Sequence, residues 1–426
     1  MSVKSSIVTE PDCTFAPDGV FDVDQVRRDF PALSRTVRNG NPLIYLDSAA
    51  RSQMPVQVIE AMRRFDSTSV ANVHRGIHQL SDEATDAYEE ARLRVARFVG
   101  AKDENEIVFV RNTTEALNLV AFAWAMHNLN PGDAIVTSVM EHHSNLVPWQ
   151  ILTRFKGLTL KHIPILPSGE LDYEAAEKLI TPDVRLVTIV HLSNVLGLVN
   201  DVAALARMAR AVGAVFVIDG SQSAAHMPVN LSEIDCDFYS LSGYKMLGPT
   251  GIGALWGRKT LLDAMEPFMS GGSMIEEVGL FESTWAPVPQ KFEAGTPNIT
   301  GAVGLGVATL YIDRLGRERA HEHECGLIRY AVDNLQAIGG VDVYGDVPNR
   351  SSAIAFNIRG MHPHDTSSIL DSEGVAVRAG HHCAQPLHAA LGIDSSTRAS
   401  FHCYNNRDDV DRFIAAIETA KSLFGY

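Results

Sequence analysis

The sequence lacks the features that mark several common classes of protein. It has no stretch of about 18 apolar residues, so we expect no transmembrane helix. It has no lysine- or arginine-rich run, and 36 Lys and Arg residues against 51 Asp and Glu residues give a net charge of −15. Because nucleic acids and anionic membranes are bound through basic patches, we expect neither as a partner. The opening residues Met1–Ser6 lack the apolar core of a signal peptide.

Cysteine is also scarce. The five cysteines are odd in number and irregularly spaced: Cys13, Cys236, Cys325, Cys383 and Cys403. This pattern excludes a regular disulfide framework and favours a reducing compartment, so we predict a cytoplasmic protein.

The composition is typical of a globular protein, with 46% hydrophobic residues. A chain of 426 residues is long enough for one to three domains. Short apolar runs, each followed by a helical pattern, predict strands over 42–47, 106–110, 134–137, 185–191 and 215–219, and helices over 113–126, 145–154 and 202–212. This alternation is typical of a mainly parallel sheet that is covered on both faces.

The pattern changes after about residue 300. The elements predicted there are helices 317–337 and 408–424 and strands 341–344, 353–358 and 375–378. They indicate a smaller α+β domain. At the other end of the chain, residues 1–20 lack periodicity and are expected to form a flexible tail, and Phe21–Phe30 is expected to form a short helix that ends at Pro31.

Two charged residues sit where an enzyme would use them. Lys245 lies in a Gly- and Pro-rich loop after the apolar run 235–240. It could be an ordinary surface lysine, but a buried lysine has a lowered pKa and suits Schiff-base chemistry. Asp219 ends an apolar strand, where it could cap a helix or pair with a pyridinium nitrogen.

Other motifs offer weaker signals. Asn112–Glu115 has the form of a capping box, and a helix start of this kind also suits a phosphate. In Glu141-His142-His143 the adjacent imidazoles do not converge on one metal, so stacking on a flat cofactor is favoured. The His321–Glu324 run is expected to form an exposed helix face.

The loop around Cys383 carries the most reactive group. Its His-His-Cys run lacks a fourth ligand at zinc-site spacing, so a free thiol activated by Arg378 and the histidines is the alternative. Arg398 opens an apolar strand and could be a surface charge or a clamp for a carboxylate. We predict no resident metal.

In this order the motifs resemble one family, the SufS-type (group II) cysteine desulfurases, which are class-V, fold-type-I pyridoxal phosphate (PLP) enzymes. The resemblance extends from about Phe21 to the C-terminus. It rests on residues 45–50 (YLDSAA), 73–76 (VHRG), 140–143 (MEHH), 193–197 (SNVLG), 292–297 (FEAGTP) and 378–384 (RAGHHCA). The last of these separates the group from group I desulfurases, whose cysteine lies on a longer loop.

The resemblance implies a domain organisation. A flexible tail over 1–20 and a segment over 21–35 that packs with the small domain would precede a large PLP-binding domain over 36–299 with a mainly parallel seven-stranded sheet. A small α+β domain over 300–426 would carry the loop of the persulfide cysteine.

The resemblance also implies cofactor contacts. Lys245 matches the lysine that holds PLP, Asp219 the partner of the pyridinium nitrogen, and His142 the stacking residue. The remaining matches are Gln222 and Asn194 around the pyridoxal oxygen, Thr113, Thr114 and Ser242 at the phosphate, and Thr296 at the phosphate of a neighbouring subunit. A homodimer is therefore implied. Where the family has a histidine before the lysine, this chain has Tyr244, which can donate a hydrogen bond but cannot carry a positive charge.

The reaction implied is removal of sulfur from L-cysteine. It would leave alanine and a persulfide on Cys383, for transfer to a SufU- or SufE-type acceptor and iron–sulfur cluster assembly. Substrate-binding matches are Arg398, Arg378 and Asn194, with His74 and Arg75 near the substrate thiol. His364 matches a histidine that swaps onto the zinc of SufU, although a solvated helix-start loop is the alternative. Alternative functions are a selenocysteine lyase or related class-V PLP enzyme, and a catalytically weak sulfur carrier.

Overall fold

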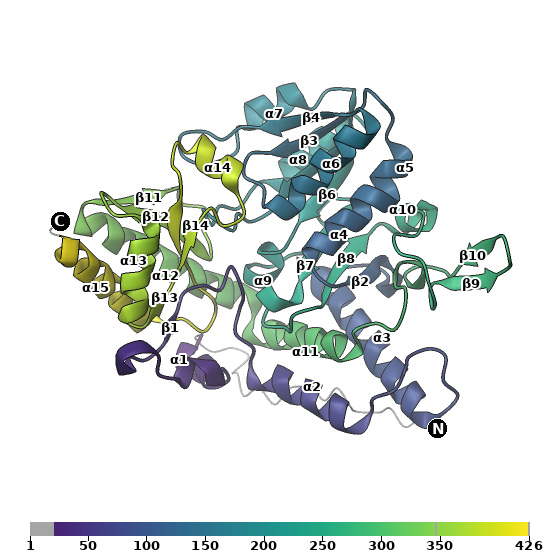
Figure 1. Ribbon diagram of the computed structural model, residues 1–426, viewed down its shortest axis with the longest axis horizontal. Helices are drawn as coiled ribbons and strands as arrows, with labels where there is room; N and C mark the ends of the chain where they lie inside the picture. The colour runs from purple at the N-terminus through teal and green to yellow at the C-terminus, as the bar shows by residue number, and fades with distance from the viewer. Residues whose placement is uncertain (1–20, 346, 425–426) are drawn as a thin grey trace.

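The computed structural model describes residues 21–345 and 347–424, and its largest feature is a seven-stranded sheet (Figure 1). The tail predicted over 1–20 lies outside the described residues. The strands follow the order β2-β8-β7-β6-β5-β3-β4 across the sheet. Their bounds are β2 (Ile107–Val110), β3 (Ala134–Ser138), β4 (Thr159–Ile163), β5 (Val184–Val190), β6 (Val215–Asp219), β7 (Phe238–Ser242) and β8 (Gly253–Gly257).

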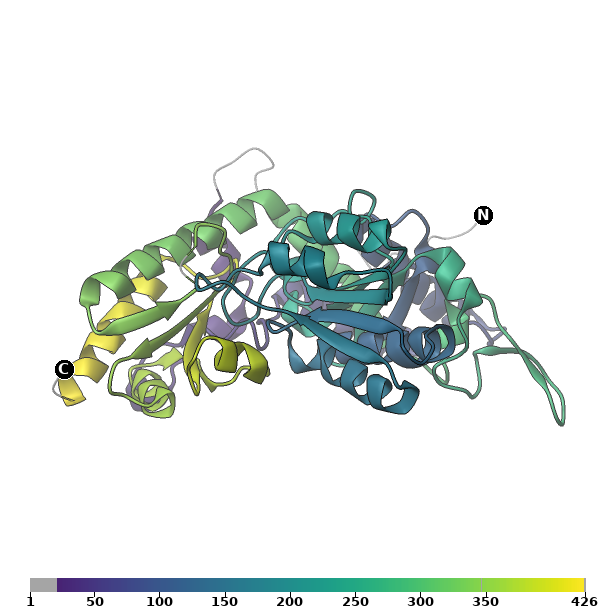
Figure 2. The same cartoon turned by 90° about the horizontal axis from the view of Figure 1, so that it is seen from above.

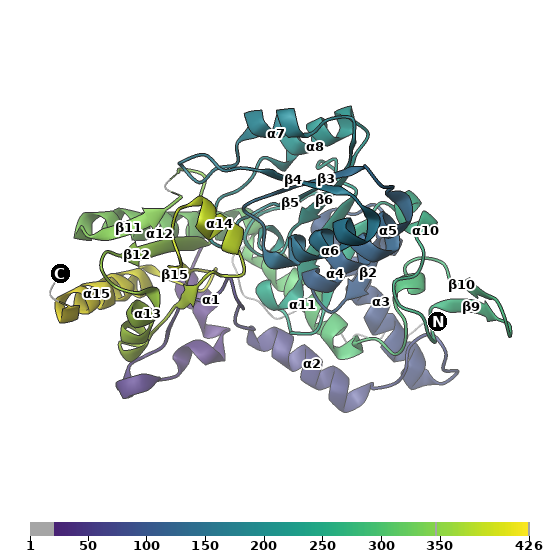
Figure 3. The ribbon, with the colours of Figure 1, turned by 45° about the horizontal axis from the view of Figure 1, so that its top comes forward.

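Most of this sheet is parallel, as the apolar runs predict. Strand β8 is antiparallel to both of its neighbours, and the remaining four pairs are parallel. Helices α4 (Thr113–Leu119) and α6 (Val147–Lys156) lie on one face, and α7 (Tyr173–Leu179) and α8 (Val202–Ala211) lie on the other (Figure 3). Because both faces are covered, strands such as β2 and β7 are buried along their whole length.

A second, four-stranded antiparallel sheet lies beside the first. Its order is β11-β12-β15-β14, with bounds β11 (Val341–Tyr344), β12 (Ala353–Ile358), β14 (Arg378–Gly380) and β15 (Ser396–Ser400). Helices α12 (Arg317–Ile338), α13 (Pro363–Ser372) and α15 (Arg407–Phe424) accompany it, and residues such as Leu327, Phe356 and Phe413 form its core. A short helix, α14 (Gln385–Ala390), lies at the junction of the two sheets in Figure 1 and Figure 3.

The segment after residue 20 packs against the C-terminal part of the chain. It contains α1 (Val23–Arg28), where Arg27 forms a 2.7 Å ion pair with Asp409. Strand β1 (Ile44–Tyr45) is shorter than the predicted 42–47 and pairs with β13 (Val375–Ala376). The strand predicted over 375–378 is accordingly divided, because its first residues pair with β1 and the residues from Arg378 onward pair with β15.

Three long helices have no counterpart in the sequence analysis: α2 (Val56–Thr68), α3 (Gln79–Val99) and α11 (Ile299–Leu315). Helix α11 packs along both of the others. At Gly306 an added Cβ would lie 2.9 Å from the Cα of Ala91, so glycine allows α11 and α3 to approach closely. The predicted helix 113–126 is present, but it continues from α4 through a π-helical segment over Val120–Ala125 into α5 (Met126–Asn128).

A two-stranded hairpin of β9 (Ile275–Val278) and β10 (Ser283–Trp285) projects from the body of the molecule (Figure 2). Short helices α9 (Ser223–His226) and α10 (Lys259–Ala264) complete the connections. Among the described residues, no helix is both long enough and apolar enough to cross a membrane.

Candidate active site

The predicted site residues follow the ends of five strands. Asp219 is the last residue of β6, and Thr113, His142, Asn194 and Lys245 follow β2, β3, β5 and β7. Because these five strands run in the same direction, their carboxyl ends meet at one edge of the sheet, where ligands bind in open α/β folds. The observed topology therefore places these five residues at one edge of the sheet.

Lys245 is buried at this edge, in a short turn after β7. Burial lowers the pKa of its amine to about 8; Asp219 acts against this shift, and Arg398 adds to it. Ser52 fixes the turn, because its hydroxyl lies 3.1 Å from the carbonyl oxygen of Tyr244 and accepts the amide of Leu247 at 2.8 Å. The amine thus loses its proton more readily than an ordinary lysine does, as a nucleophile or base requires.

Asp219 is 3% exposed and is oriented by its neighbour. Its Oδ1 accepts the Ser221 amide at 2.9 Å and the Ser221 hydroxyl at 2.6 Å. The carboxylate is therefore fixed in direction, which suits a partner for a protonated ring nitrogen.

The start of α4 gathers hydroxyl groups. The Thr113 amide donates to Ser242 Oγ at 2.9 Å, and the two hydroxyls lie 3.1 Å apart. Thr114 Oγ1 lies 2.7 Å from Ser144 Oγ. Burial raises the pKa of Tyr244, and a hydrogen bond with Ser242 opposes that rise, so the tyrosine in place of the family's histidine lies beside this hydroxyl group. Hydroxyls at a helix start suit a phosphate.

The capping box at this helix start is half formed. Asn112 accepts the amide of Glu115 at 3.0 Å, as predicted. The Glu115 carboxylate, however, accepts the amide of Arg111 instead of the amide of Asn112.

The two histidines after β3 diverge, as expected for neighbours. His142 Nδ1 accepts the amide of Ser144 at 3.0 Å, and burial lowers the pKa of this ring to about 3, so the imidazole is neutral. His143 donates its amide to the carbonyl oxygen of Cys383 at 2.7 Å, and its Nε2 accepts the Gln385 amide at 3.2 Å. His143 thus connects the large sheet to the cysteine loop, a role that the sequence analysis missed.

Two buried acceptors test whether the site fits PLP. Gln222 donates to the carbonyl oxygen of Ala49 at 2.9 Å, and Asn194 donates to that of His382 at 2.9 Å. Their side-chain oxygens are buried and have no hydrogen-bond partner in the described structure. Buried polar atoms are nearly always paired, so these two oxygens indicate a polar ligand between them. With the amine of Lys245, the carboxylate of Asp219 and the hydroxyls of α4, they fit the polar groups of PLP.

Two arginines and the cysteine complete the site. Arg398 is 1% exposed, donates to Asp47 Oδ1 at 2.8 Å and to the Asn194 carbonyl oxygen at 3.0 Å, and has an Nε with no partner among the described residues. Arg378 Nη2 lies 3.9 Å from Cys383 Sγ. Burial lowers the pKa of Arg398, and Asp47 opposes the shift. The arrangement can bind an anion beside a thiol.

The structure does not bring every predicted residue to this site within one chain. His74 pairs with Glu89 at 3.3 Å, and neither it nor Arg75 contacts Lys245 or Cys383 among the described hydrogen bonds and ion pairs. His364 is exposed on α13, with its ring stacked on that of His362.

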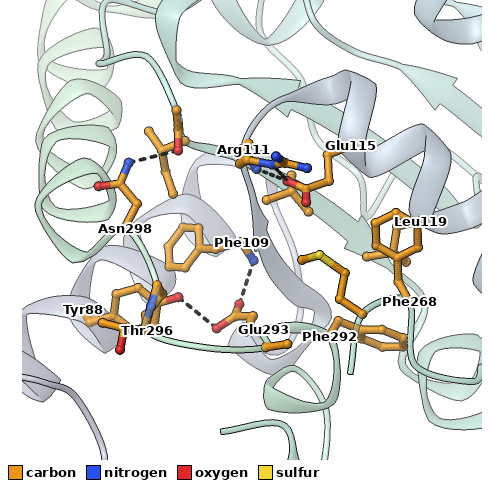
Figure 4. A pocket seen from close by; sticks show the side chains of 16 residues that line it. Tyr88, Phe109, Arg111, Glu115, Leu119, Phe268, Phe292, Glu293, Thr296 and Asn298 are labelled. Atoms are coloured by element: carbon orange, nitrogen blue, oxygen red, sulfur yellow. Dashed lines mark hydrogen bonds and ion pairs between the residues drawn. The ribbon is translucent and has the colours of Figure 1, made fainter. Parts of the chain in front are cut away.

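Thr296 lies at a separate cavity of about 280 Å³ (Figure 4). Tyr88, Glu293 and Asn298 line the same cavity, and Glu293 accepts the Tyr88 hydroxyl at 2.8 Å. Tyr88 also contacts the His74 ring edge to face, with centroids 6.0 Å apart, so one residue connects the wall of this cavity to His74.

One expectation is wrong. The His321–Glu324 run is not an exposed face, because Glu324 is 1% exposed. Its carboxylate lies 2.8 Å from His226 Nδ1 and 3.5 Å from His402 Nδ1. Burial raises the pKa of Glu324 to about 7 and lowers those of the two histidines to about 3 and about 4. Glu324 and His226 thus connect α12 to α9, the short helix that follows Asp219.

Comparison with known proteins gives one consistent result. Residues 44–413 match the family described as aminotransferase class-V. The chain is 49% identical over 407 residues to a probable cysteine desulfurase of Halobacterium salinarum, covering 95% of this chain and 98% of that protein. It is 47% identical over 416 residues to a cysteine desulfurase of Haloferax volcanii, covering 95% and 98%.

Solved structures agree. An apo cysteine desulfurase from Thermococcus onnurineus superposes with a TM-score of 0.89 at 42% identity, covering 94% of this chain and 98% of that chain. The Escherichia coli cysteine desulfurase CsdA, in an S-sulfonic acid form, gives a TM-score of 0.88 at 39% identity, covering 95% and 100%. The chain therefore belongs to the class-V aminotransferase family of PLP enzymes, on its cysteine desulfurase branch, and it has the fold-type-I architecture of that family.

Proposed function

We propose that this protein is a PLP-dependent cysteine desulfurase of the group II, SufS type. The observation that carries the proposal is the placement of Cys383 beside Arg378, with both of them close enough to act on the pKa values of Lys245 and Arg398. One site thus holds a thiol, a cationic group for a carboxylate and an amine with a lowered pKa. The loop from 378 to 384 (RAGHHCA) supports the group II assignment.

The cofactor would be held by residues of the large sheet. Lys245 would hold its aldehyde group, Asp219 its ring nitrogen, and Thr113, Thr114 and Ser242 its phosphate, with Tyr244 beside them. His142 would stack on the ring, while Gln222 and Asn194 would supply the two unpaired oxygens. When bound, PLP supplies a protonated ring that accepts electron density from the substrate's α-carbon.

The chain's own residues perform the remaining work. Arg398 binds the carboxylate of L-cysteine through its unpaired Nε, and Lys245 removes the proton from Cα. The Cys383 thiolate attacks the substrate sulfur, so an S–S bond forms while the Cβ–S bond breaks. The electron pair of the broken bond stays on the carbon skeleton, Cβ takes up a proton, and Lys245 returns the proton to Cα to give alanine, so no external oxidant is needed. Holding both sulfurs in one site replaces a bimolecular encounter.

A homodimer and a sulfur acceptor are part of the proposal. Thr296 lines a cavity that Lys245 does not line, and Tyr88 of the same cavity contacts the His74 ring, which supports a second copy seated there and reached by Thr296, His74 and Arg75. The exposed His364 supports a SufU-type acceptor. We place the reaction in iron–sulfur cluster assembly in the cytoplasm, with a large domain over 36–299 and a small domain over 300–426.

The test is an assay of purified holoenzyme with L-cysteine and a reductant. We expect release of alanine and sulfide, and we expect Cys383→Ser to abolish both while the PLP absorption band remains. Cys325→Ser, on α12, is the matched control and should retain activity. Persistent release by Cys383→Ser would overturn the assignment of the nucleophile.

A further inference from the structure

A buried histidine lies one helical turn after the reactive cysteine and has no part in the mechanism above. His388 is on α14 and is 1% exposed. Its Nδ1 lies 3.0 Å from the carbonyl oxygen of Ala384, the residue after Cys383. Its Nε2 lies 3.0 Å from the Ser396 hydroxyl on β15.

The direction of each hydrogen bond follows from its partner. A carbonyl oxygen can only accept, so His388 Nδ1 carries a proton and donates it to Ala384. Burial lowers the pKa of His388, so its Nε2 is unprotonated and accepts the Ser396 hydroxyl proton. His382 Nε2 lies 3.0 Å from the Ser396 carbonyl oxygen and 3.1 Å from its hydroxyl, so it donates there.

These bonds close a ring around Cys383. The path runs from the His382 side chain to Ser396, to the His388 side chain, to the Ala384 carbonyl, and back along the chain through Cys383. In each hydrogen bond of this ring, the chemistry of the two groups fixes which one donates and which one accepts. Removing the imidazole of His388 would leave the Ala384 carbonyl with the His388 backbone amide at 3.3 Å and the Ser396 hydroxyl with His382 Nε2 at 3.1 Å, so the ring would open while each group kept one weaker partner.

The backbone of the loop needs such support. His382 and Cys383 have φ values of 50° and 60°, in the left-handed region that residues other than glycine rarely adopt. Two consecutive residues of this kind persist when surrounding contacts hold them in place. Two hydrogen bonds hold the upstream side of the loop. The side-chain amide of Asn194 donates to the His382 carbonyl, and the backbone amide of His143 donates to the Cys383 carbonyl. His388 holds the downstream side.

The ring also sets the distance between thiol and substrate. Ser396 and Arg398 lie two residues apart on β15, so their side chains point to the same face. Because the Cys383 loop is hydrogen-bonded to Ser396, its position is fixed relative to β15, the strand that carries Arg398. A thiol that attacks a sulfur must be placed to within about 1 Å, because a shift of that size costs on the order of a hundredfold in rate.

We propose that His388 is a positioning residue that, through the Ser396 hydroxyl and the Ala384 carbonyl, holds Cys383 in line with the substrate sulfur. The proposal rests on the proposed function for the identity of the transferred atom. It concerns the sulfur-transfer step alone, because none of the described contacts of His388 involves Lys245 or Arg398.

The experiment compares holoenzyme variants of His388. His388→Leu removes both nitrogens at similar volume, whereas His388→Asn keeps an amide that can donate to Ala384. We expect His388→Leu to lower kcat for alanine release by about 10- to 100-fold. The KM for L-cysteine and the change in PLP absorption on adding L-cysteine should stay unchanged, and His388→Asn should recover part of the loss. His127→Gln, an exposed histidine on α5, is the matched control.

A second readout does not depend on turnover. The rate at which iodoacetamide alkylates Cys383, followed on its own peptide, should change in His388→Leu and in Ser396→Ala, and the double variant should show no further change. The proposal would be overturned if His388→Leu kept the kcat and the alkylation rate of the wild type. It would also be overturned if His388→Leu lost the change in PLP absorption to the same extent as it lost kcat. If His388→Leu does not fold, His388→Asn and Ser396→Ala decide by the same criteria. A wild-type enzyme that releases no alanine contradicts the proposed function instead, and the alkylation rates still test the ring.

Discussion

Arg378 and Arg398 lie directly opposite each other on the antiparallel strands β14 and β15. Like charges in this position destabilise a sheet, and Asp47 is the carboxylate that pairs with Arg398. An anion between the two guanidinium groups would relieve the repulsion. The carboxylate of an amino-acid substrate fits this position.

Arg398→Lys is expected to weaken substrate binding, because an ammonium group cannot reproduce the hydrogen bonds of the planar guanidinium. A charge-assisted hydrogen bond contributes about 1.5–3 kcal/mol, so the KM for L-cysteine should rise by roughly 10- to 100-fold. Steady-state kinetics of alanine release measures this. Arg359→Lys, which is exposed and pairs with Asp342, is the control, and an unchanged KM in Arg398→Lys would rule out the clamp.

Lys245 should react as an amine with a pKa of about 8 in the apoenzyme. Below this pH the amine is protonated and cannot attack an electrophile, so its acetylation rate should rise as pH increases through about 8. Peptide mapping after brief acetic anhydride treatment gives the profile, with the exposed Lys102 as the reference for reagent reactivity. In Asp219→Asn the midpoint should fall, because Asp219 opposes the lowering. A wild-type midpoint near the ordinary lysine value of about 10.4 contradicts the burial of this amine.

Glu324 should contribute to stability as the centre of the group with His226 and His402. Both histidines are neutral, so Glu324→Ala would leave the buried His226 nitrogen without its hydrogen-bond partner, which costs about 1–3 kcal/mol, and the free energy of unfolding should fall by that amount. Glu324→Gln should cost less, because an amide can still hydrogen-bond both rings. Urea denaturation measures the change. Its exposed neighbour Glu322→Ala should stay within about 0.5 kcal/mol, and equal effects at both positions would show that Glu324 is not paired.

His364 should matter for one class of acceptor. Zinc-loaded SufU-type protein, titrated into the assay, is expected to stimulate turnover of the wild type and not of His364→Ala. A SufE-type acceptor, which offers no zinc, should act equally on both proteins. Equal stimulation by the SufU-type protein would remove His364 from the proposed exchange.

Much of the site was predictable because its residues follow local patterns. Asp219 ends an apolar run and Thr113 begins a helix, and the parallel sheet then brings such strand ends together. The sequence could not reveal partners that come from distant segments. Glu324 is buried by His226 and His402, each about 80 to 100 positions away, although its place in the apolar stripe with Ala320, Leu327 and Ala331 was a usable signal.

Two further features depended on tertiary context. The strand predicted over 375–378 is divided in two, because its first part pairs with β1 and its last part pairs with β15. His388 lies on a six-residue helix whose local sequence does not indicate burial, and its partners become visible when β15 packs beneath the cysteine loop. In both cases the deciding contacts join residues from separate elements.

The central claim is that Cys383 accepts the substrate sulfur. The most direct test is mass spectrometry of the holoenzyme after one turnover with L-cysteine in the absence of reductant, with the modified peptide identified. The account predicts one added sulfur atom on the peptide containing Cys383 and an equal amount of alanine. Added sulfur on Cys325 or Cys403 with Cys383 unmodified, or alanine without any protein-bound sulfur, would contradict it.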